Sequence, residues 1–185
     1  EELVFSGDSA DIVKDVWYVL SIEVSGDAIS LYVNDVLELV INDSTFSSGV
    51  IGIRTWNAHI LVDHVTVSGF PSITYDFDEL LNWTVVGGTW SVLNGSLDGF
   101  SSAEGLIYTS DMIWNDCMLN AKVKIAADSP RAEAAFCVCI VDSGNFYWAG
   151  LGCWGHRVSI SRMIGHVSEE LVFSGDSADI VKDVW

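Results

Sequence analysis

Basic residues are scarce in this chain, which has 8 Lys and Arg against 26 Asp and Glu among 185 residues. The formal net charge of −18 disfavours nucleic acid and anionic membranes as partners, because both repel an acidic protein. No apolar run is long enough for a transmembrane helix, so no membrane span is expected. Half of the residues are hydrophobic, which argues against a disordered polypeptide.

Several motifs of catalysis and metal binding are also missing. The four cysteines form no C-x-x-C pair and have no zinc-finger spacing, and no G-x-S-x-G nucleophile elbow occurs. No segment keeps the helical period of about 3.6 residues over a helix-length window. The sequence therefore predicts neither a structural zinc site nor a serine hydrolase, and it predicts few helices.

What the chain does have is a series of short alternating segments separated by Gly, Asn and Asp turns. Val16 to Val24 alternates apolar and polar residues and leads into Ser25-Gly26-Asp27, a hairpin turn. Gly49 to Trp56 and Ile60 to Val67 are predicted to form another pair, joined near Asn57. Roughly a dozen such strands predict an all-β fold, an antiparallel β-sandwich of the jelly-roll type.

One stretch occurs twice. Residues 1–17 and residues 169–185 both read EELVFSGDSADIVKDVW, an offset of 168 residues. Self-similarity at a fixed period indicates a repeat array. Two interpretations stay open: a window from an array of near-identical modules, or a permuted chain in which one terminal segment is duplicated. We favour the array, because the duplicate ends within a predicted strand at Trp17 and Trp185.

Several motifs resemble those of concanavalin A-like (laminin G-like) jelly-roll domains, in an order that is permuted. The motifs are Tyr75-Asp76-Phe77-Asp78, Trp83, Gly88-Thr89-Trp90, Asn94-Gly95-Ser96-Leu97, Asn145-Phe146-Tyr147-Trp148, Trp17-Tyr18-Val19-Leu20, Leu31-Tyr32-Val33-Asn34-Asp35, Gly49 to Arg54 and Val62 to Val67. The family's usual start falls at Tyr75 and its usual end at Ser68. The resemblance implies that residues 1–68 are the second half of one sandwich module and residues 75–185 the first half of the next. Residues 69–74, around the Pro71 breaker, would then be an inter-module linker.

The same resemblance points to carbohydrate and metal ligands. Lectin sites combine an aromatic platform with a few polar groups. The candidates are Tyr147, Trp148, Trp154, His156 and Arg157 in one cluster, and Trp56 and Asn57 in another. Asp76, Asp78 and Asp63 are weak candidates for Ca²⁺, the single cofactor considered. The competing interpretation makes the tryptophans core residues and the acids turn or strand-end residues. A glycoside hydrolase needs two acids at a suitable spacing, and the sequence offers only poor candidates for such a pair. No enzyme is therefore expected.

Two kinds of modification are predicted. Asn42, Asn82 and Asn94 each begin an N-x-S/T sequon, which is a glycosylation signal in a secreted protein. The spacing of Cys137 and Cys139 on one predicted strand puts both thiols on one face. Cys117 paired with either of them is the disulfide that we expect, with buried free thiols as the alternative.

The preferred function is a structural or adhesive module of an extracellular tandem-repeat surface protein or filament. Its partners would be neighbouring copies of the same module, which complete each sandwich, and the two copies of the repeated stretch would have the same conformation. The alternatives are a stand-alone lectin-like domain that binds glycans and, less favoured, a glycoside hydrolase.

Overall fold

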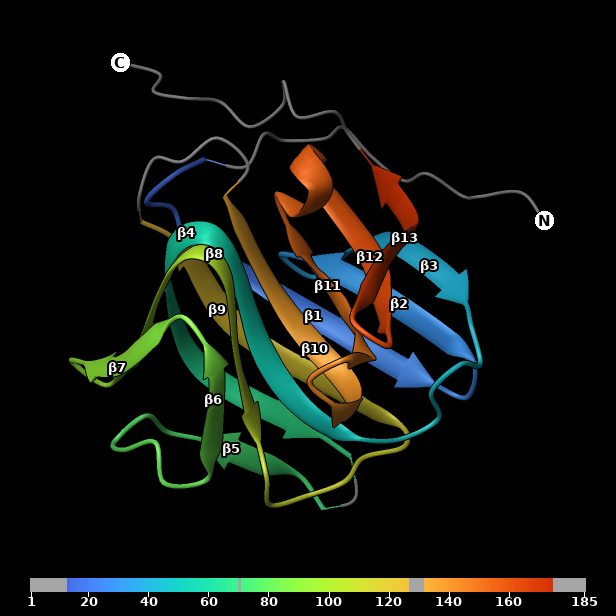
Figure 1. Cartoon of the computed structure of the whole chain (residues 1–185), viewed down its shortest axis with the longest axis horizontal. Helices are drawn as coiled ribbons and strands as arrows, with labels where there is room; N and C mark the ends of the chain where they lie inside the picture. Colours follow the sequence, from blue (N-terminus) through green and yellow to red (C-terminus); the bar gives the residue numbers. More distant parts are fainter. Residues whose placement is uncertain (1–12, 70, 127–131, 175–185) are drawn as a thin grey trace.

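The computed structural model describes residues 13–69, 71–126 and 132–174, and nearly all of its regular structure is β-strand (Figure 1). The exception is a 3-10 turn, η1 (Cys153–Gly155). None of the helical structure in these ranges has the length and apolar character that crossing a membrane requires. The strands are β1 (Tyr18–Ser25), β2 (Ala28–Val33), β3 (Val36–Asn42), β4 (Val50–Ser68), β5 (Ile73–Tyr75), β6 (Trp83–Gly87), β7 (Thr89–Leu93), β8 (Ser96–Thr109), β9 (Cys117–Ile125), β10 (Glu133–Asp142), β11 (Asn145–Leu151), β12 (Val158–Ile164) and β13 (Val167–Ser174).

Alternation of apolar and polar residues determines which face each strand buries. In β1, Leu20 and Ile22 are fully buried while Glu23 between Ile22 and Val24 is partly exposed. The predicted turn after β1 is confirmed, because Ser25 lies opposite Ala28 and Gly26 has a φ of 58°. Such positive φ values are what a two-residue hairpin turn requires. The all-β prediction is therefore confirmed.

The long strand β4 corrects one prediction. Gly49 to Trp56 and Ile60 to Val67 were expected to form a pair that reverses near Asn57, but they form one 19-residue strand. Asn57 has a φ of 48°, and the register of β4 against β8 shifts between Trp56 and Ala58. The left-handed residue Asn57 is thus absorbed as a β-bulge, which bends a strand without reversing it.

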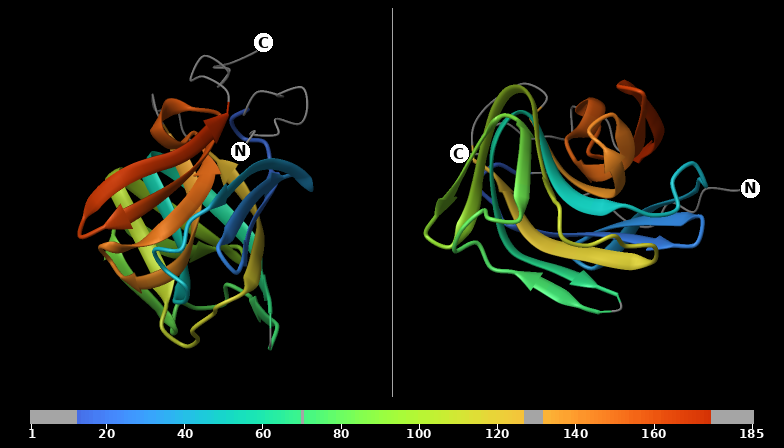
Figure 2. Two further views of the ribbon diagram at one scale, coloured as in Figure 1. Left: turned by 90° about the vertical axis from the view of Figure 1, so that its right-hand side faces the viewer. Right: turned by 60° about the horizontal axis from the view of Figure 1, so that its bottom comes forward.

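All described strand pairs are antiparallel, and they form one strongly curved sheet. The order is β13-β12-β11-β10-β4-β9-β1-β2-β3, with β5 on β4, β8 also on β4, and β6 and β7 on β8. Figure 2 shows how the sheet folds over, so that β9, β1, β2 and β3 form one layer beneath the other. Ion pairs of Arg157 with Glu38 and of Arg162 with Asp43 bring the two ends together. The sheet is therefore nearly closed around the main hydrophobic core.

Residues 69–74 were predicted to link two modules. Here residues 69 and 71–74 lie in and beside the connection of a hairpin, because Val67 of β4 is opposite Ile73 of β5. Residues from both predicted halves also alternate in the sheet: β1 pairs with β9, and β4 pairs with β10. The two segments thus complete one another within one chain in this structure. The predicted linker does not separate the two segments here, because it joins two antiparallel neighbours, β4 and β5, by a short connection. Completion of modules by neighbouring repeats stays a prediction.

The prediction that both copies of the repeated stretch share one conformation lies outside the described residues. The structure describes residues 13–17 of the first copy and residues 169–174 of the second. No position of the repeat is described in both copies.

Candidate ligand site on the outer face of the curved layer

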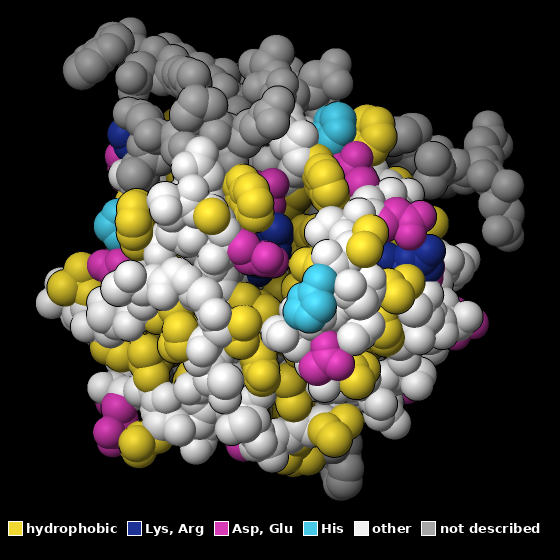
Figure 3. Space-filling model, viewed as in Figure 1, with side chains coloured by type: hydrophobic (Ala, Val, Ile, Leu, Met, Phe, Trp, Pro, Cys, Tyr) yellow, Lys and Arg dark blue, Asp and Glu magenta, His cyan; other side chains and the backbone are white. Residues whose placement is uncertain are grey.

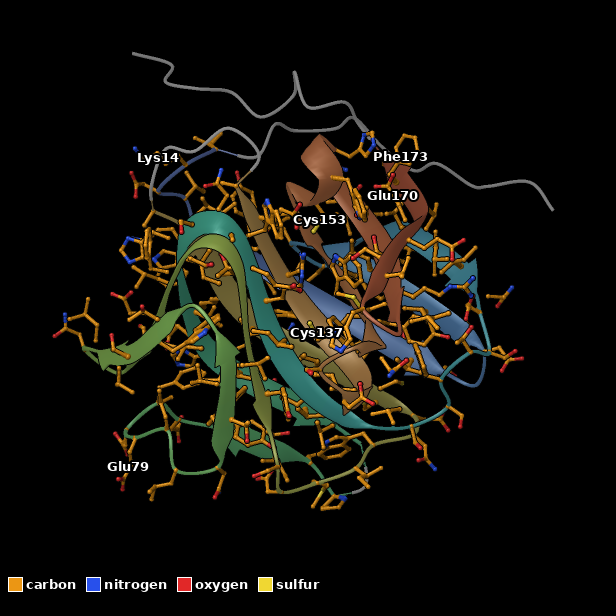
Figure 4. The ribbon with its side chains drawn as sticks, in the orientation of Figure 1. Lys14, Glu79, Cys137, Cys153, Glu170 and Phe173 are labelled. Atoms are coloured by element: carbon orange, nitrogen blue, oxygen red, sulfur yellow. The ribbon has the colours of Figure 1, made fainter. Side chains whose placement is uncertain are left out.

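A second, smaller hydrophobic cluster covers the outer face of the layer formed by β8, β4, β10, β11 and β12. It contains Leu106, Ala135, Cys137, Ile140, Phe146, Trp148, Cys153 and Met163. Figure 3 shows a hollow in the middle of this face, where hydrophobic side chains surround basic and acidic ones. Figure 4 shows that Cys137, Cys153 and Glu170 lie in the region between β4 and β13. We call this region the outer-face site.

Arg54 is the charged centre of the outer-face site. Residues directly opposite one another in an antiparallel sheet share a face, and Arg54 is opposite Leu106 on β8 and Ala135 on β10. These neighbours leave room for its side chain, which is only 5% exposed. The guanidinium lies 5.7 Å from the ring centroid of Trp56 and 4.8 Å from that of Trp148. Arg54 is therefore held between two aromatic side chains.

Two carboxylates neutralise Arg54. Nη1 donates to Glu133 Oε2 at 2.6 Å, and Nε donates to Glu104 Oε1 at 3.2 Å. Both acids lie opposite Trp56, on the strands to either side of β4. Burial lowers the pKa of Arg54, but the carboxylates outweigh burial and raise that pKa above its usual value. The pair with Glu133 is a buried, charge-assisted contact, whereas Glu104 is substantially exposed.

Trp154 lies at the rim of the site with one edge fixed and its ring 46% exposed. Its backbone N–H donates to Glu133 Oε1 at 3.0 Å, and its indole Nε1 donates to Ser161 Oγ at 3.0 Å. Gly152 and Trp154 have φ values of 74° and 57°, so the chain turns sharply there. Trp56 is also exposed, at 38%. The site therefore presents two tryptophan side chains to solvent, and Trp154 is anchored by hydrogen bonds.

A row of directly opposite residues crosses the site from Trp148 on β11 through Ser161 on β12 to Glu170 on β13. Trp148 is 1% exposed, and its Nε1 has no hydrogen-bond partner among the described residues. The same is true of the buried Oε1 atom of Glu170. A buried polar atom without a partner costs about 1–3 kcal/mol. One donor and one acceptor in this row thus have no hydrogen-bond partner among the described residues.

Glu170 has an unusual environment. Its Oε2 lies 3.4 Å from Nε2 of His156, whose ring stacks on Phe173 with a centroid distance of 3.9 Å. Burial raises the pKa of the Glu170 carboxyl; His156 and Ser159 lower it in part, and the Glu133 carboxylate raises it further. Glu133 and Glu170 are therefore two acids with different surroundings: Glu133 is buried and paired with a guanidinium, whereas Glu170 is partly buried beside a histidine.

Four predicted sugar-binding residues, Trp56, Trp148, Trp154 and His156, come together in or beside this site, although they lie on separate elements. Two others do not reach it. Tyr147 faces the main core and its hydroxyl bonds to Asp43, and burial raises its pKa to about 12. Arg157 is buried in an ion pair with Glu38.

Asn57 occupies the β4 bulge, and its backbone conformation rather than a ligand contact explains its position. Sequence reasoning missed Arg54, Glu104, Glu133 and Glu170. A lone arginine in the apolar strand Val50 to Trp56 was the one available signal, since a buried charge requires a partner.

The calcium prediction gains no support from the structure. Asp63 lies 2.8 Å from Nδ1 of His64, and Asp76 and Asp78 flank the buried Phe77 just after β5, the strand that pairs with β4. Within residues 13–69, 71–126 and 132–174, no three or more His, Cys, Asp and Glu side chains are grouped so that they could hold a metal ion. The asparagines of the sequons, Asn42, Asn82 and Asn94, are all exposed, and their glycosylation stays a prediction.

The predicted disulfide is not formed: Cys117, Cys137, Cys139 and Cys153 are all buried free thiols. The expectation that Cys137 and Cys139 share a face is wrong. Cys139 has a φ of 52° at a bulge of β10, so Cys139 faces the main core while Cys137 faces the outer-face cluster. Burial raises the pKa of Cys117 to about 12 and that of Cys139 to about 11.

No family model matches the chain. The chain is similar to an extracellular exo-alpha-L-arabinofuranosidase of Streptomyces chartreusis, with 31% identity over 119 residues. The matched stretch is 60% of this chain and 14% of that relative, so this chain spans only a small part of the relative's length. The relative acts outside the cell and is, by its name, a glycoside hydrolase.

Proposed function

We propose that this chain is an extracellular carbohydrate-binding module and that the sugar binds at the outer-face site. The observation that carries this proposal is the unpartnered donor of Trp148 and the unpartnered acceptor of Glu170, which flank Ser161 in one row. A sugar hydroxyl group both donates and accepts hydrogen bonds, so it satisfies both kinds of atom. The relative's action on arabinofuranosides agrees with a sugar ligand.

The remaining groups fit the two faces of a sugar ring. The exposed indole rings of Trp56 and Trp154 offer flat apolar surfaces for the C–H face of the ring. Arg54 is already paired with Glu133 and Glu104, so it is not a free cation for an anionic ligand. The finer fold that we propose is a concanavalin A-like sandwich of the jelly-roll type, entered at a permuted position. Its support is the order of the motifs together with the short β4–β5 hairpin.

A glycan array followed by titration calorimetry with the strongest ligand tests this proposal. Trp154→Ala is expected to weaken binding at least about tenfold, because it removes an anchored aromatic surface. Trp17→Ala is the matched control, since Trp17 is 40% exposed but lies over Lys124 and outside the site. Equal affinity of wild type and Trp154→Ala would exclude the outer-face site.

Glycoside hydrolysis is the second candidate, and it opposes the expectation that the chain is not an enzyme. The supporting observation is that Glu133 and Glu170 have unlike environments, as an acid–base pair requires. Glu170 would give its proton to the glycosidic oxygen, and Glu133 would take a proton from the water that attacks the anomeric carbon. Release of nitrophenol from 4-nitrophenyl α-L-arabinofuranoside, lost in Glu170→Gln, is the test. Sugar binding without release of nitrophenol would reject hydrolysis and leave carbohydrate binding as the proposed function.

A structural or adhesive role in a tandem array remains a third proposal, and its support is the repeated 17-residue sequence. Repeat modules are stabilised by their neighbours. Sugar binding and array formation are compatible, because a multivalent array increases avidity.

A further inference from the structure

The last described strand, β13, belongs in large part to the repeated stretch. Its residues 169–174 read EELVFS, and residues 1–6 read the same letters. The N-terminal copy therefore contains a second sequence that is suited to the position of β13. Identical sequences have identical preferences for a strand and for its neighbours.

Several contacts of β13 are made by side chains that the repeat duplicates, whereas Val167 and Ser168 at its start lie outside the repeat. Glu169 accepts from Arg162 Nε at 3.0 Å and from Nη2 at 2.8 Å, and Phe173 stacks on His156. Val172 is 6% exposed and lies opposite Ile160. Glu1, Val4 and Phe5 are the counterparts of Glu169, Val172 and Phe173 in the first copy. None of these contacts needs a residue that the first copy lacks.

The position of β13 favours replacement. It is at one end of the strand order and, within the described residues, pairs only with β12. A terminal strand exposes an edge, which is where another chain adds most easily. Exchange of an identical element between copies costs little in contacts, because the same contacts are re-formed.

The other half of the repeat is used at the opposite end of the chain. Asp15 N donates to Ile125 O at 2.9 Å, and Val13 N donates to the hydroxyl of Tyr18 at 2.7 Å. One sandwich therefore uses residues 13–17 from the first copy and residues 169–174 from the second. The remaining residues 1–6 duplicate a strand that this sandwich already has.

We propose that residues 1–6 of a second copy of this chain occupy the position of β13 and pair with β12. The incoming strand would place Glu2 and Phe5 where Glu170 and Phe173 lie, so the second copy supplies part of the outer-face site. In a covalent array with a 168-residue period, the same strand position would join successive modules. The exchange does not depend on sugar binding, whereas its effect on the site rests on the proposed function.

The duplication provides a matched pair of variants in the full chain. Val172→Asp places a charge at the buried position of the resident strand and leaves residues 1–6 intact, and Val4→Asp makes the same change in the first copy only. Light scattering during size exclusion is expected to give Val172→Asp at least twice the monomer mass, increasing with concentration. Val4→Asp is expected to be monomeric, and so is the double variant.

Three results would overturn the exchange: equal mass distributions for the two single variants, a monomeric Val172→Asp as stable as wild type, or a Val172→Asp unfolded at every concentration by circular dichroism. The second result would mean that residues 1–6 fill the position within their own chain. In oligomers of Val172→Asp, adding Glu2→Gln is expected to reduce sugar affinity several-fold, whereas Glu1→Gln is not. Oligomers that bind no sugar in any variant would reject the proposed function and leave the exchange intact.

Discussion

Replacing Arg54 by Met tests whether the charge at the centre of the outer-face site is as tightly integrated as the structure shows. The substitution keeps much of the apolar stem but leaves Glu133, which is 7% exposed, without its guanidinium partner. Removing one member of a buried ion pair costs about 3–5 kcal/mol, because the other charge remains buried. Loss of the contacts with Trp56 and Trp148 adds about 1 kcal/mol. We expect urea unfolding to show a loss of about 4–6 kcal/mol at neutral pH.

The pH dependence of this loss identifies its cause. Without Arg54, the carboxylate of Glu133 is a buried charge with no guanidinium partner, and an unpaired buried charge is costly. Acid reduces the number of unpaired charges in the folded state, so this cost falls at low pH. The deficit of Arg54→Met is therefore expected to be smaller at pH 4 than at pH 8.

Two companion variants complete the test. Arg54→Met combined with Glu133→Gln is expected to regain about 1–2 kcal/mol, because no buried charge remains. Glu104→Gln alone is expected to cost at most about 1 kcal/mol, since the Glu104 side chain is 40% exposed. The reasoning is refuted if Arg54→Met unfolds at the urea concentration of wild type, or if its deficit is the same at both pH values.

Three further outcomes are expected. Asn57→Val is expected to destabilise the chain by about 1–3 kcal/mol because the bulge has a positive φ, and Asn57→Gly by much less; urea unfolding of the pair measures the difference. Glu170→Gln is expected to gain stability relative to wild type as pH rises above 4.5, because the raised pKa of Glu170 makes its ionisation destabilising. If this is wrong, the difference in melting temperature between Glu170→Gln and wild type will not change between pH 4 and 8. All four thiols are expected to resist iodoacetamide in the native state and to react in denaturant without reductant, because they are buried and free; mass spectrometry that finds fewer than four alkylated thiols in denaturant would indicate a disulfide.

Local chemistry made much of the fold predictable. The alternation in β1 and β2 and the Gly26 turn between them depend on residues close in sequence, so the sequence determines them directly. The Asn57 bulge was not predictable, because an Asn in the left-handed region fits a turn as well as a bulge. Its outcome depends on strands far along the chain: β8 pairs with both sides of that residue, and β10 pairs with the residues before it.

The candidate site was predictable only in its aromatic part. Trp148, Trp154 and His156 are close in sequence and were found together. Arg54 and Glu133 are 79 residues apart, and no local pattern indicates that they meet. The thiol prediction failed for a related reason, because the bulge at Cys139 changes the face on which every later side chain of β10 lies.

The pairing of β1 with β9 has a consequence for how the chain folds during synthesis. Leu20 lies opposite Ala121, so β1 has no partner on that edge until about a hundred more residues have been made. The β1–β2–β3 meander therefore has one unpaired edge until β9 has been made. Such long-range pairings also slow folding. This topology therefore places the pairing of β1 with β9 late in synthesis, after the strands between them have been made.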